Sequence, residues 1–257
     1  MLLHTFQHIQ GIGPKSERNL WAAGCRQWQD LIEQRFDRSL CSISASIQDY
    51  AQEQVSVDWQ LFQQNDLKSL AERFKQTDHW RFYQHFAKRT VYLDIETTGT
   101  DPRSSLVTVI GIYSEQAGAQ VFIDGINLDS FPAAIQDFDI IVTFNGGSFD
   151  LPFLRRNFPD LQLPPAHIDC RWLARSCDLT GGLKKIEREL GIERNPEVAN
   201  MSGAEAVTLW QRYLRQADQS ALHALVRYNL EDTINLQCLL HICLNRIYNR
   251  HPFLDLE

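Results

Sequence analysis

The chain has 257 residues, of which 44% are hydrophobic and 22% charged, values typical of one large folded domain or of a standard domain with a small appendage. It has no apolar run near the roughly 18–20 residues of a membrane helix, and its first residues lack the pattern of a signal peptide, so we expect a cytoplasmic protein without a membrane partner. The net charge of −7 argues against a broad basic surface for nucleic acid, and the acidic excess lies in residues 90–257.

The six cysteines form no C-x-x-C pair, which argues against a zinc knuckle or ribbon. Free cysteines are usually buried, and a cytoplasmic protein keeps them reduced. We therefore expect reduced and mostly buried thiols at Cys25, Cys41, Cys170, Cys177, Cys238 and Cys243.

Residues 1–89 have the pattern of short helices with almost no strand signal. The stretch from Gly11 to Gly13 predicts a tight turn between helices, and Pro14 suits the first position of the second one. Lys15 would add positive charge where backbone N–H groups favour an anion. The segment resembles a helix-hairpin-helix motif, which binds DNA phosphates without reading sequence. The alternative is a helical hairpin that only packs on the rest of the protein.

Strand patterns begin at residue 90. Three strand-like runs, "TVYLDIE", "SLVTVIGIYSE" and "AQVFIDG", have short connections and predict an antiparallel meander. A helical segment, the near-continuous apolar strand "DIIVTFNG", a helix, a short strand and further helices follow. The order predicts an α/β fold over residues 90–250, a mixed sheet flanked by helices, with a small all-helical region over residues 1–89.

Acidic residues stand at the ends of several of these elements. Asp94 and Glu96 lie two apart in "VYLDIETTGT", so a strand sends both to one face. Asp150 follows an apolar strand and begins a helix, while Tyr228 and Asp232 lie four apart on one face of a long helix. Each acid alone has a structural alternative, such as a helix cap or a solvated strand end. Together they predict a site for hard divalent cations, because clustered carboxylates repel one another until a cation binds.

The segments "DIETTG", "NGGSFD" and "YNLED" resemble the three exonuclease motifs of the DEDD superfamily of 3′–5′ exonucleases, which have the ribonuclease H-like fold. A tyrosine four residues before the last aspartate is typical of the tyrosine subclass. "NGGSFDLPFL" is similar to the exonuclease domains of family B DNA polymerases, and "GGLKKIERELGIER" supports a resemblance to the YprB-type group. The resemblance covers roughly residues 90–245.

This resemblance implies hydrolysis of phosphodiester bonds at nucleic-acid ends, with single-stranded 3′ ends as the expected substrate and two Mg²⁺ or Mn²⁺ ions as cofactors. In that scheme Asp94 bridges both ions, and Glu96 and Asp232 complete the tighter site. Asp150 holds the second ion through water. Tyr228 orients the attacking water and contacts the scissile phosphate.

Candidate contacts to nucleic acid lie near the same motifs. Thr97 to Gly99 would let the backbone approach the terminal nucleotide, as glycine-containing turns permit. Asn145 matches a polar position of the second motif and either contacts substrate or only shapes the turn. Lys184 and Lys185 follow a Gly-Gly turn that directs the start of their helix toward phosphate.

Two other functions remain open from the sequence: a non-catalytic nucleic-acid-binding module, and a structure-specific endonuclease that uses the same metal site. The complete set of acids together with the tyrosine favours the exonuclease over the non-catalytic module, whereas cutting of closed circles would distinguish the endonuclease. Trp172 and Trp210 lie in helical patterns, and we expect them in the core rather than on a base-stacking surface.

Overall fold

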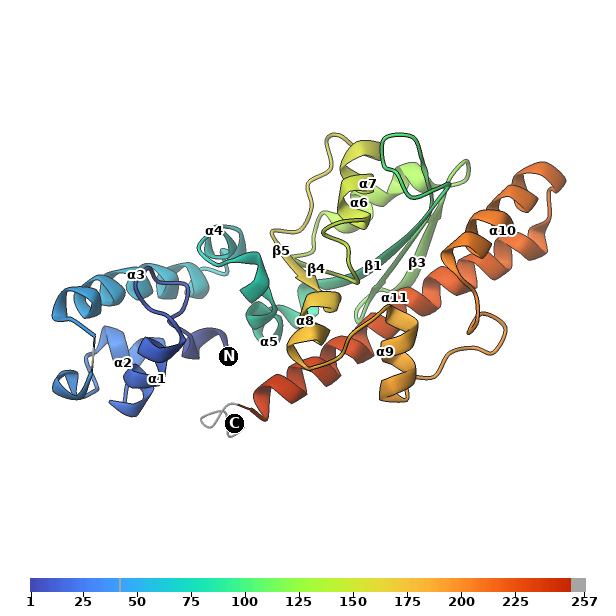
Figure 1. Ribbon diagram of the computed structural model, residues 1–257. Helices are drawn as coiled ribbons and strands as arrows, with labels where there is room; N and C mark the ends of the chain where they lie inside the picture. The colour runs from blue at the N-terminus through green and yellow to red at the C-terminus, as the bar shows by residue number, and fades with distance from the viewer. Residues whose placement is uncertain (42, 251–257) are drawn as a thin grey trace. The chain divides into compact units, whose positions relative to one another are not determined.

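A computed structural model of the chain describes residues 1–41 and 43–250 (Figure 1). It divides the chain into two units, one formed by Met1–His85 with residues 248–250 and the other by Phe86–Ile247. No helix in these described ranges is long and apolar enough to cross a membrane.

The first unit is helical, as the sequence predicts. Its described residues contain no strand. The helices are α1–α5 with the short 3₁₀ turns η1–η3: η1 (Leu2–His4), α1 (Pro14–Ala22), α2 (Trp28–Ile32), η2 (Arg38–Leu40), α3 (Ala45–Gln63), α4 (Leu67–Glu72), η3 (Gln76–Phe82) and α5 (Tyr83–Phe86).

The glycine turn of this unit differs in part from the expectation. Helix α1 begins at Pro14 with Gly13 as its N-cap residue, as predicted. Before Gly11, however, the described residues form only the 3₁₀ turn η1 and no α-helix. The buried carboxylate of Glu17 accepts hydrogen bonds from the Phe6 backbone N–H and from the Thr5 hydroxyl, both at 2.8 Å. These bonds hold the preceding segment in an irregular conformation, because its donors point to a side chain rather than along a helix.

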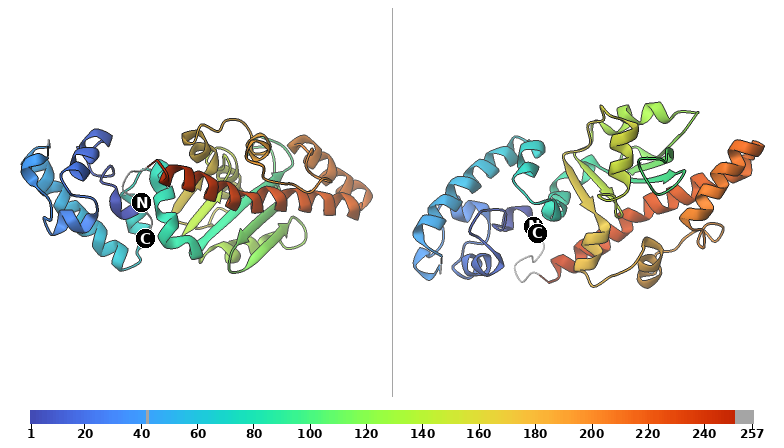
Figure 2. Two further views of the ribbon diagram at one scale, coloured as in Figure 1. Left: turned by 90° about the horizontal axis from the view of Figure 1, so that it is seen from below. Right: turned by 45° about the horizontal axis from the view of Figure 1, so that its top comes forward.

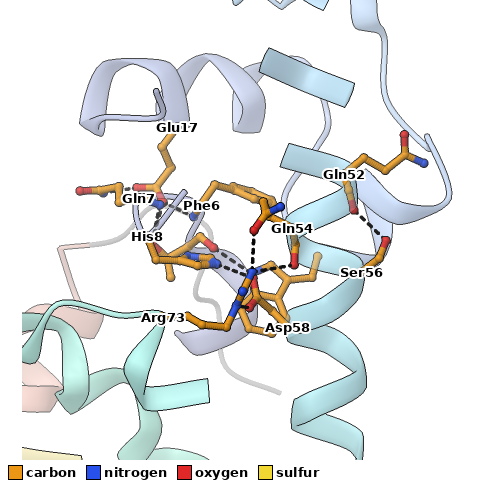
Figure 3. A network of polar contacts seen from close by, with 11 residues as sticks. Phe6, Gln7, His8, Glu17, Gln52, Gln54, Ser56, Asp58 and Arg73 are labelled. Carbon is orange, nitrogen blue, oxygen red and sulfur yellow. Dashed lines mark hydrogen bonds and ion pairs between the residues drawn. The ribbon is translucent and has the colours of Figure 1, made fainter. Parts of the chain in front are cut away.

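A second buried carboxylate joins α3 to its neighbours (Figure 3). Asp58 on α3 is hydrogen-bonded to the His8 ring at 2.9 Å and to the guanidinium of Arg73. Arg73 also donates to the Gln54 side chain at 2.9 Å. Because a buried charge is tolerated only when it is paired, this network fixes how the N-terminal segment packs on α3.

The second unit contains a five-stranded mixed sheet, which confirms the predicted fold class. The strand order is β3-β2-β1-β4-β5. The first three strands form the expected antiparallel meander. Strand β4 pairs in parallel with β1, and β5 pairs in parallel with β4. The bounds are β1 (Thr90–Thr97), β2 (Val107–Ser114), β3 (Gly118–Ile123), β4 (Ile140–Thr143) and β5 (Ala166–Asp169).

Helices cover both faces of this sheet (Figures 1 and 2). Helices α6 and α7 lie on one face, and the long α11 crosses the other together with α10. The bounds are η4 (Ala87–Arg89), η5 (Leu128–Ser130), α6 (Phe131–Ile135), α7 (Asp150–Asn157), α8 (Cys170–Ser176), α9 (Leu183–Leu190), α10 (Gly203–Gln216) and α11 (Gln219–Tyr248).

The alternation of side chains along β1 assigns its two faces. Val91, Leu93 and Ile95 are buried in the core shared with α6 and α7. The intervening Asp94 and Glu96 therefore point to the opposite face, where α11 lies. One face of β1 thus packs in the apolar core, and the opposite face carries two carboxylates.

The sequence predicts that Trp210 and Trp172 both lie in the core, which is right for Trp210 and wrong for Trp172. Trp210 is 2% exposed and packs with residues of α11, whereas Trp172 is 59% exposed. Helix α8 is short and buries Cys170, Leu173 and Ala174 on one face. Trp172 falls outside that face and points to solvent.

The six cysteines are all free, as expected. Five of them are buried, and Cys238 is exposed.

A glycine on β2 sets how closely α11 approaches the sheet. Gly111 pairs with Asp94 across the β1–β2 ladder. A Cβ atom at Gly111 would lie 2.2 Å from Oδ1 of Asn229 and 2.7 Å from Oγ1 of Thr233. Both neighbours belong to α11, so only glycine permits this spacing.

We predict that Gly111→Ala lowers the free energy of unfolding by about 1–3 kcal/mol, the usual effect of overpacking a filled core. Urea unfolding followed by circular dichroism measures the change. Gly203→Ala is the matched control, because a Cβ atom there meets nothing within 4 Å. Equal stabilities of Gly111→Ala and the wild type would contradict the argument about helix spacing.

Candidate active site

Three carboxylates that are distant in the sequence meet between β1 and α11. Asp94, Glu96 and Asp232 each offer one oxygen, and these oxygens lie within 4.8 Å of one another. Glu96 and Asp232 are buried, and Asp94 is half-buried. The structure thus brings three of the four predicted acids together.

The fourth predicted acid, Asp150, is the buried first residue of α7. Its charge contributes to the raised pKa of Asp94 and of Glu96, so it acts on the same cluster. The loop before it is fixed by Asn145, which has a left-handed backbone (φ 65°) and donates its N–H to Asp169 at 2.8 Å.

Burial and mutual repulsion together disfavour the charged forms of these acids. The pKa of Asp94 is raised by burial and then by the like charges of the other carboxylates. The pKa of Glu96 is raised by the same causes in the same order. Burial, with Asp169 as the nearby like charge, raises the pKa of Asp150 to about 7, although hydrogen bonds from backbone N–H groups oppose the shift.

Tyr228 and Lys184 flank the carboxylates. The pKa of the Tyr228 hydroxyl is raised by burial and then by the nearby negative charges of Asp232, Glu96 and Asp94. Lys184 Nζ lies 4.2 Å from the centre of the Tyr228 ring, a cation–π contact. This Nζ is buried and has no hydrogen-bond partner among the described residues. Burial lowers the pKa of Lys184.

The other residues predicted to contact nucleic acid lie in different parts of the structure and have different partners. The Thr97 hydroxyl donates to the Gly99 carbonyl oxygen at 2.6 Å and shapes the turn after β1. The Asn145 side chain accepts hydrogen bonds from Arg171 at 2.6 Å and from Ser148 at 2.9 Å. Lys185 is exposed. The remaining predicted contacts belong to the first unit: Gly11, Gly13 and Lys15.

Sequence reasoning missed two residues that contact the acids. Asn229 donates from Nδ2 to Asp94 Oδ2 at 2.9 Å and to the Asp94 carbonyl oxygen at 3.1 Å. It stands three residues before Asp232, so the helical spacing used for Tyr228 could also have found it. Arg194 forms an ion pair with Asp232 from the loop between α9 and α10. That loop has no periodic pattern, so no sequence signal pointed to it.

We predict that the metal-free protein loses stability as the pH rises from 5 to 7 because of these acids. A carboxyl whose pKa is raised by folding favours the folded state while it is protonated, and this contribution is lost as the pH passes its folded value. For Asp150, with a pKa of about 7, the loss is roughly 2 kcal/mol over that interval. Urea unfolding in EDTA at several pH values measures it.

Asp150→Asn should flatten this pH dependence, since the amide does not titrate. Asp129→Asn, which changes an exposed carboxylate of the same unit, is the control and should behave as the wild type. A wild-type slope that survives in Asp150→Asn would show that Asp150 is not responsible.

Comparison with solved structures finds similar but distant proteins. The family B DNA polymerase of the archaeon Pyrobaculum calidifontis is 18% identical, with a TM-score of 0.49 over 60% of this chain, and the chain spans only 24% of the polymerase's length. NrnC of Brucella melitensis bound to pGG is 20% identical, with a TM-score of 0.44 over 65% of this chain and 77% of NrnC. The EXO domain of Aedes aegypti Nibbler is 13% identical, with a TM-score of 0.43 over 66% of this chain and 85% of that domain.

Comparison with curated proteins finds no match. A model of the RNase H superfamily matches residues 91–243. The matched range runs from the second residue of β1 into α11 and includes Asp150, Tyr228 and Asp232. Because it spans more than half of the chain, this protein belongs to the RNase H superfamily.

Proposed function

We propose that this protein is a divalent-cation-dependent nuclease, and more specifically a 3′–5′ exonuclease of the DEDD tyrosine subclass related to the YprB-type group. The observation that carries the proposal is the meeting of Asp94, Glu96 and Asp232 within 4.8 Å, with Asp150 acting on the same cluster. Membership of the RNase H superfamily supports a reaction at phosphodiester bonds.

The donor set fits hard divalent cations. All of its donor atoms are carboxylate oxygens, the ligands that Mg²⁺ and Mn²⁺ prefer. The pKa values of Asp94 and Glu96 are raised by burial and then by the neighbouring carboxylates, whose negative charge a cation would compensate. Asp94, Glu96 and Asp232 would hold one ion, and Asp94 with Asp150 a second. When bound, the cations would stabilise the charge on the attacking and leaving oxygens of a phosphodiester.

The chain's own side chains have distinct roles in this proposal. The raised pKa of Tyr228 keeps its phenol protonated at neutral pH, so it orients water or phosphate as a hydrogen-bond donor rather than acting as a base. Lys184, whose buried Nζ has no partner in the described part of the chain, would contact a phosphate oxygen. The hydrogen bonds from Asn229 orient the Asp94 carboxylate.

The proposal is tested with oligonucleotides of DNA and RNA labelled at either end, incubated with Mg²⁺, Mn²⁺ or EDTA. An exonuclease of this direction shortens 5′-labelled single strands stepwise and releases the label of 3′-labelled ones as a mononucleotide, and EDTA abolishes both. Cleavage of closed circles would instead show an endonuclease. Binding without any cleavage would show a non-catalytic module.

We predict that Asp94→Ala or Asp232→Ala reduces cleavage at least about 100-fold, because each removes a ligand of the proposed ions. Tyr228→Phe should reduce it less, since the ring remains and only the hydroxyl is lost. Initial rates at saturating Mn²⁺ measure these effects, with Asp129→Asn as the control. Wild-type turnover in purified Asp94→Ala protein would contradict the assignment of the acids.

For the first unit we propose that residues 1–89 form a separate region that adds affinity for the nucleic-acid backbone, as a helix-hairpin-helix would. Gly13 caps α1 without a side-chain hydrogen bond, and Lys15 is exposed in its first turn. These features support a phosphate contact from Gly11 to Lys15.

Gly13→Glu tests this contact. A Cβ atom at Gly13 meets nothing within 4 Å, so the new side chain brings a negative charge without a clash. We predict a fall of roughly tenfold in affinity for single-stranded DNA, measured by fluorescence anisotropy in EDTA, with an unchanged melting temperature. Gly13→Ala, which adds no charge, is the control. Equal affinities of the glutamate and alanine variants would favour a purely structural role of this segment.

A further inference from the structure

Arg194 places a positive charge directly on the acidic cluster. Its guanidinium forms an ion pair with Asp232, one of the three clustered carboxylates. The same guanidinium donates to both oxygens of Glu187 on α9, at 2.5 and 2.9 Å. The Arg194 side chain is 6% exposed and that of Glu187 is 1% exposed. One buried cation is thus shared between a proposed metal ligand and a second carboxylate.

Glu187 is well placed to keep this cation. Besides the two bonds from Arg194, it accepts a hydrogen bond from Asn235 on α11 at 3.0 Å. Paired in this way, Glu187 can keep its two hydrogen bonds from the guanidinium without Asp232. This matters because a buried guanidinium left without any carboxylate would be strongly destabilising.

A divalent cation and Arg194 compete for Asp232. Both are drawn to the same carboxylate, and two cations close together repel each other. Within the described residues, Arg194 is the cation that forms an ion pair with a member of the cluster. It therefore partly relieves the repulsion among the acids when no metal is bound, and it opposes the arrival of the metal.

We propose that Arg194 is a resident counter-ion that holds Asp232 in the metal-free protein, and that Glu187 retains it when a divalent cation takes its place on Asp232. This inference rests on the proposed function, since it assumes that the cluster binds such cations. Arg194 is a positioning residue in this scheme: it sets the metal affinity and the metal-free stability of the site without touching substrate.

A second ion pair between the same loop and α11 provides matched controls. Arg227 on α11 pairs with Glu197 of the loop, and both side chains are largely exposed. In the described part of the chain, no side-chain hydrogen bond or ion pair joins Arg227 or Glu197 to Asp94, Glu96 or Asp232. Like the test variants, Arg227→Gln removes a positive charge and Glu197→Gln a negative one, but from an ion pair that does not include Asp232.

The test measures Mn²⁺ binding by isothermal titration calorimetry and unfolding in EDTA. We expect Arg194→Gln to tighten Mn²⁺ binding about tenfold and to lower the melting temperature in EDTA, because the competitor is gone and the acids repel one another. Glu187→Gln should weaken Mn²⁺ binding several-fold, because Arg194 then depends on Asp232 alone. Neither control should change the Mn²⁺ affinity by more than about twofold.

The opposite signs separate this role from a structural one. If Arg194 and Glu187 only held the fold together, both substitutions would lower stability and neither would tighten metal binding. Unchanged or weaker Mn²⁺ binding by Arg194→Gln overturns the inference. If Arg194→Gln does not fold in EDTA, Arg194→Lys replaces it in the test. The lysine keeps the positive charge but lacks the planar guanidinium, so we expect it to tighten Mn²⁺ binding less than Arg194→Gln would. Unchanged or weaker Mn²⁺ binding by Arg194→Lys also overturns the inference.

The wild-type protein distinguishes this inference from the proposed function. If it binds Mn²⁺ with the expected variant pattern but cleaves no nucleic acid, the counter-ion role stands and the nuclease does not. If it binds and cleaves but the variants follow the controls, the nuclease stands and the counter-ion role is wrong. If it binds no Mn²⁺, both are wrong.

Discussion

Burial of several carboxylates between one strand and one helix is the constraint on which the rest of the second unit depends. Asp94 and Glu96 on β1 lie close to Asp232 on α11, with Glu96 and Asp232 buried and Asp94 half-buried. Like charges at this spacing repel one another strongly in a medium of low dielectric constant. The protein therefore gives up stability at this point, and a site that is destabilised when metal-free gains most when a cation binds.

The remainder of the unit holds those carboxylates in place. The α6 and α7 face of β1 is apolar and anchors the strand in the core, so that its other face has a fixed orientation. On that face Gly111 lets α11 lie close to the sheet. Because α11 is close, the Asn229 side chain can donate a hydrogen bond to Asp94. A neutral amide is suited to this contact, because it binds the carboxylate without adding a competing charge. Rigid elements rather than loops thus carry the acids, which favours precise positioning.

The positive charges near the cluster differ in their relation to it. Lys184 lies over the ring of Tyr228 with its ammonium group free of hydrogen bonds in the described ranges, and so remains available to an incoming anion. Arg194 is already engaged with two carboxylates. The first arrangement suits recognition of a phosphate, and the second suits control of the acids themselves. Both are supplied by α9 and the loop that follows it; the sequence indicated Lys184 as a candidate contact but gave no signal for Arg194.

Periodicity determined what could be predicted from the sequence. The alternation of a strand places Asp94 beside Glu96, and the spacing of a helix places Tyr228 beside Asp232, because both regular structures fix the direction of side chains locally. The order of strand and helix patterns likewise indicated a mixed sheet with helices on both faces, and the resemblance of three short motifs indicated that their acids belong together. None of these inferences required knowledge of distances between elements.

Tertiary structure alone decided the features that depend on such distances. The outward position of Trp172 follows from which face of a two-turn helix is buried. The need for glycine at position 111 follows from the packing of a helix encoded more than a hundred residues later. The contact of Arg194 with Asp232 comes from a loop without a periodic pattern, so its partner follows only from the folded chain. A local pattern fixes the direction of a side chain, but only the folded chain decides what that side chain meets.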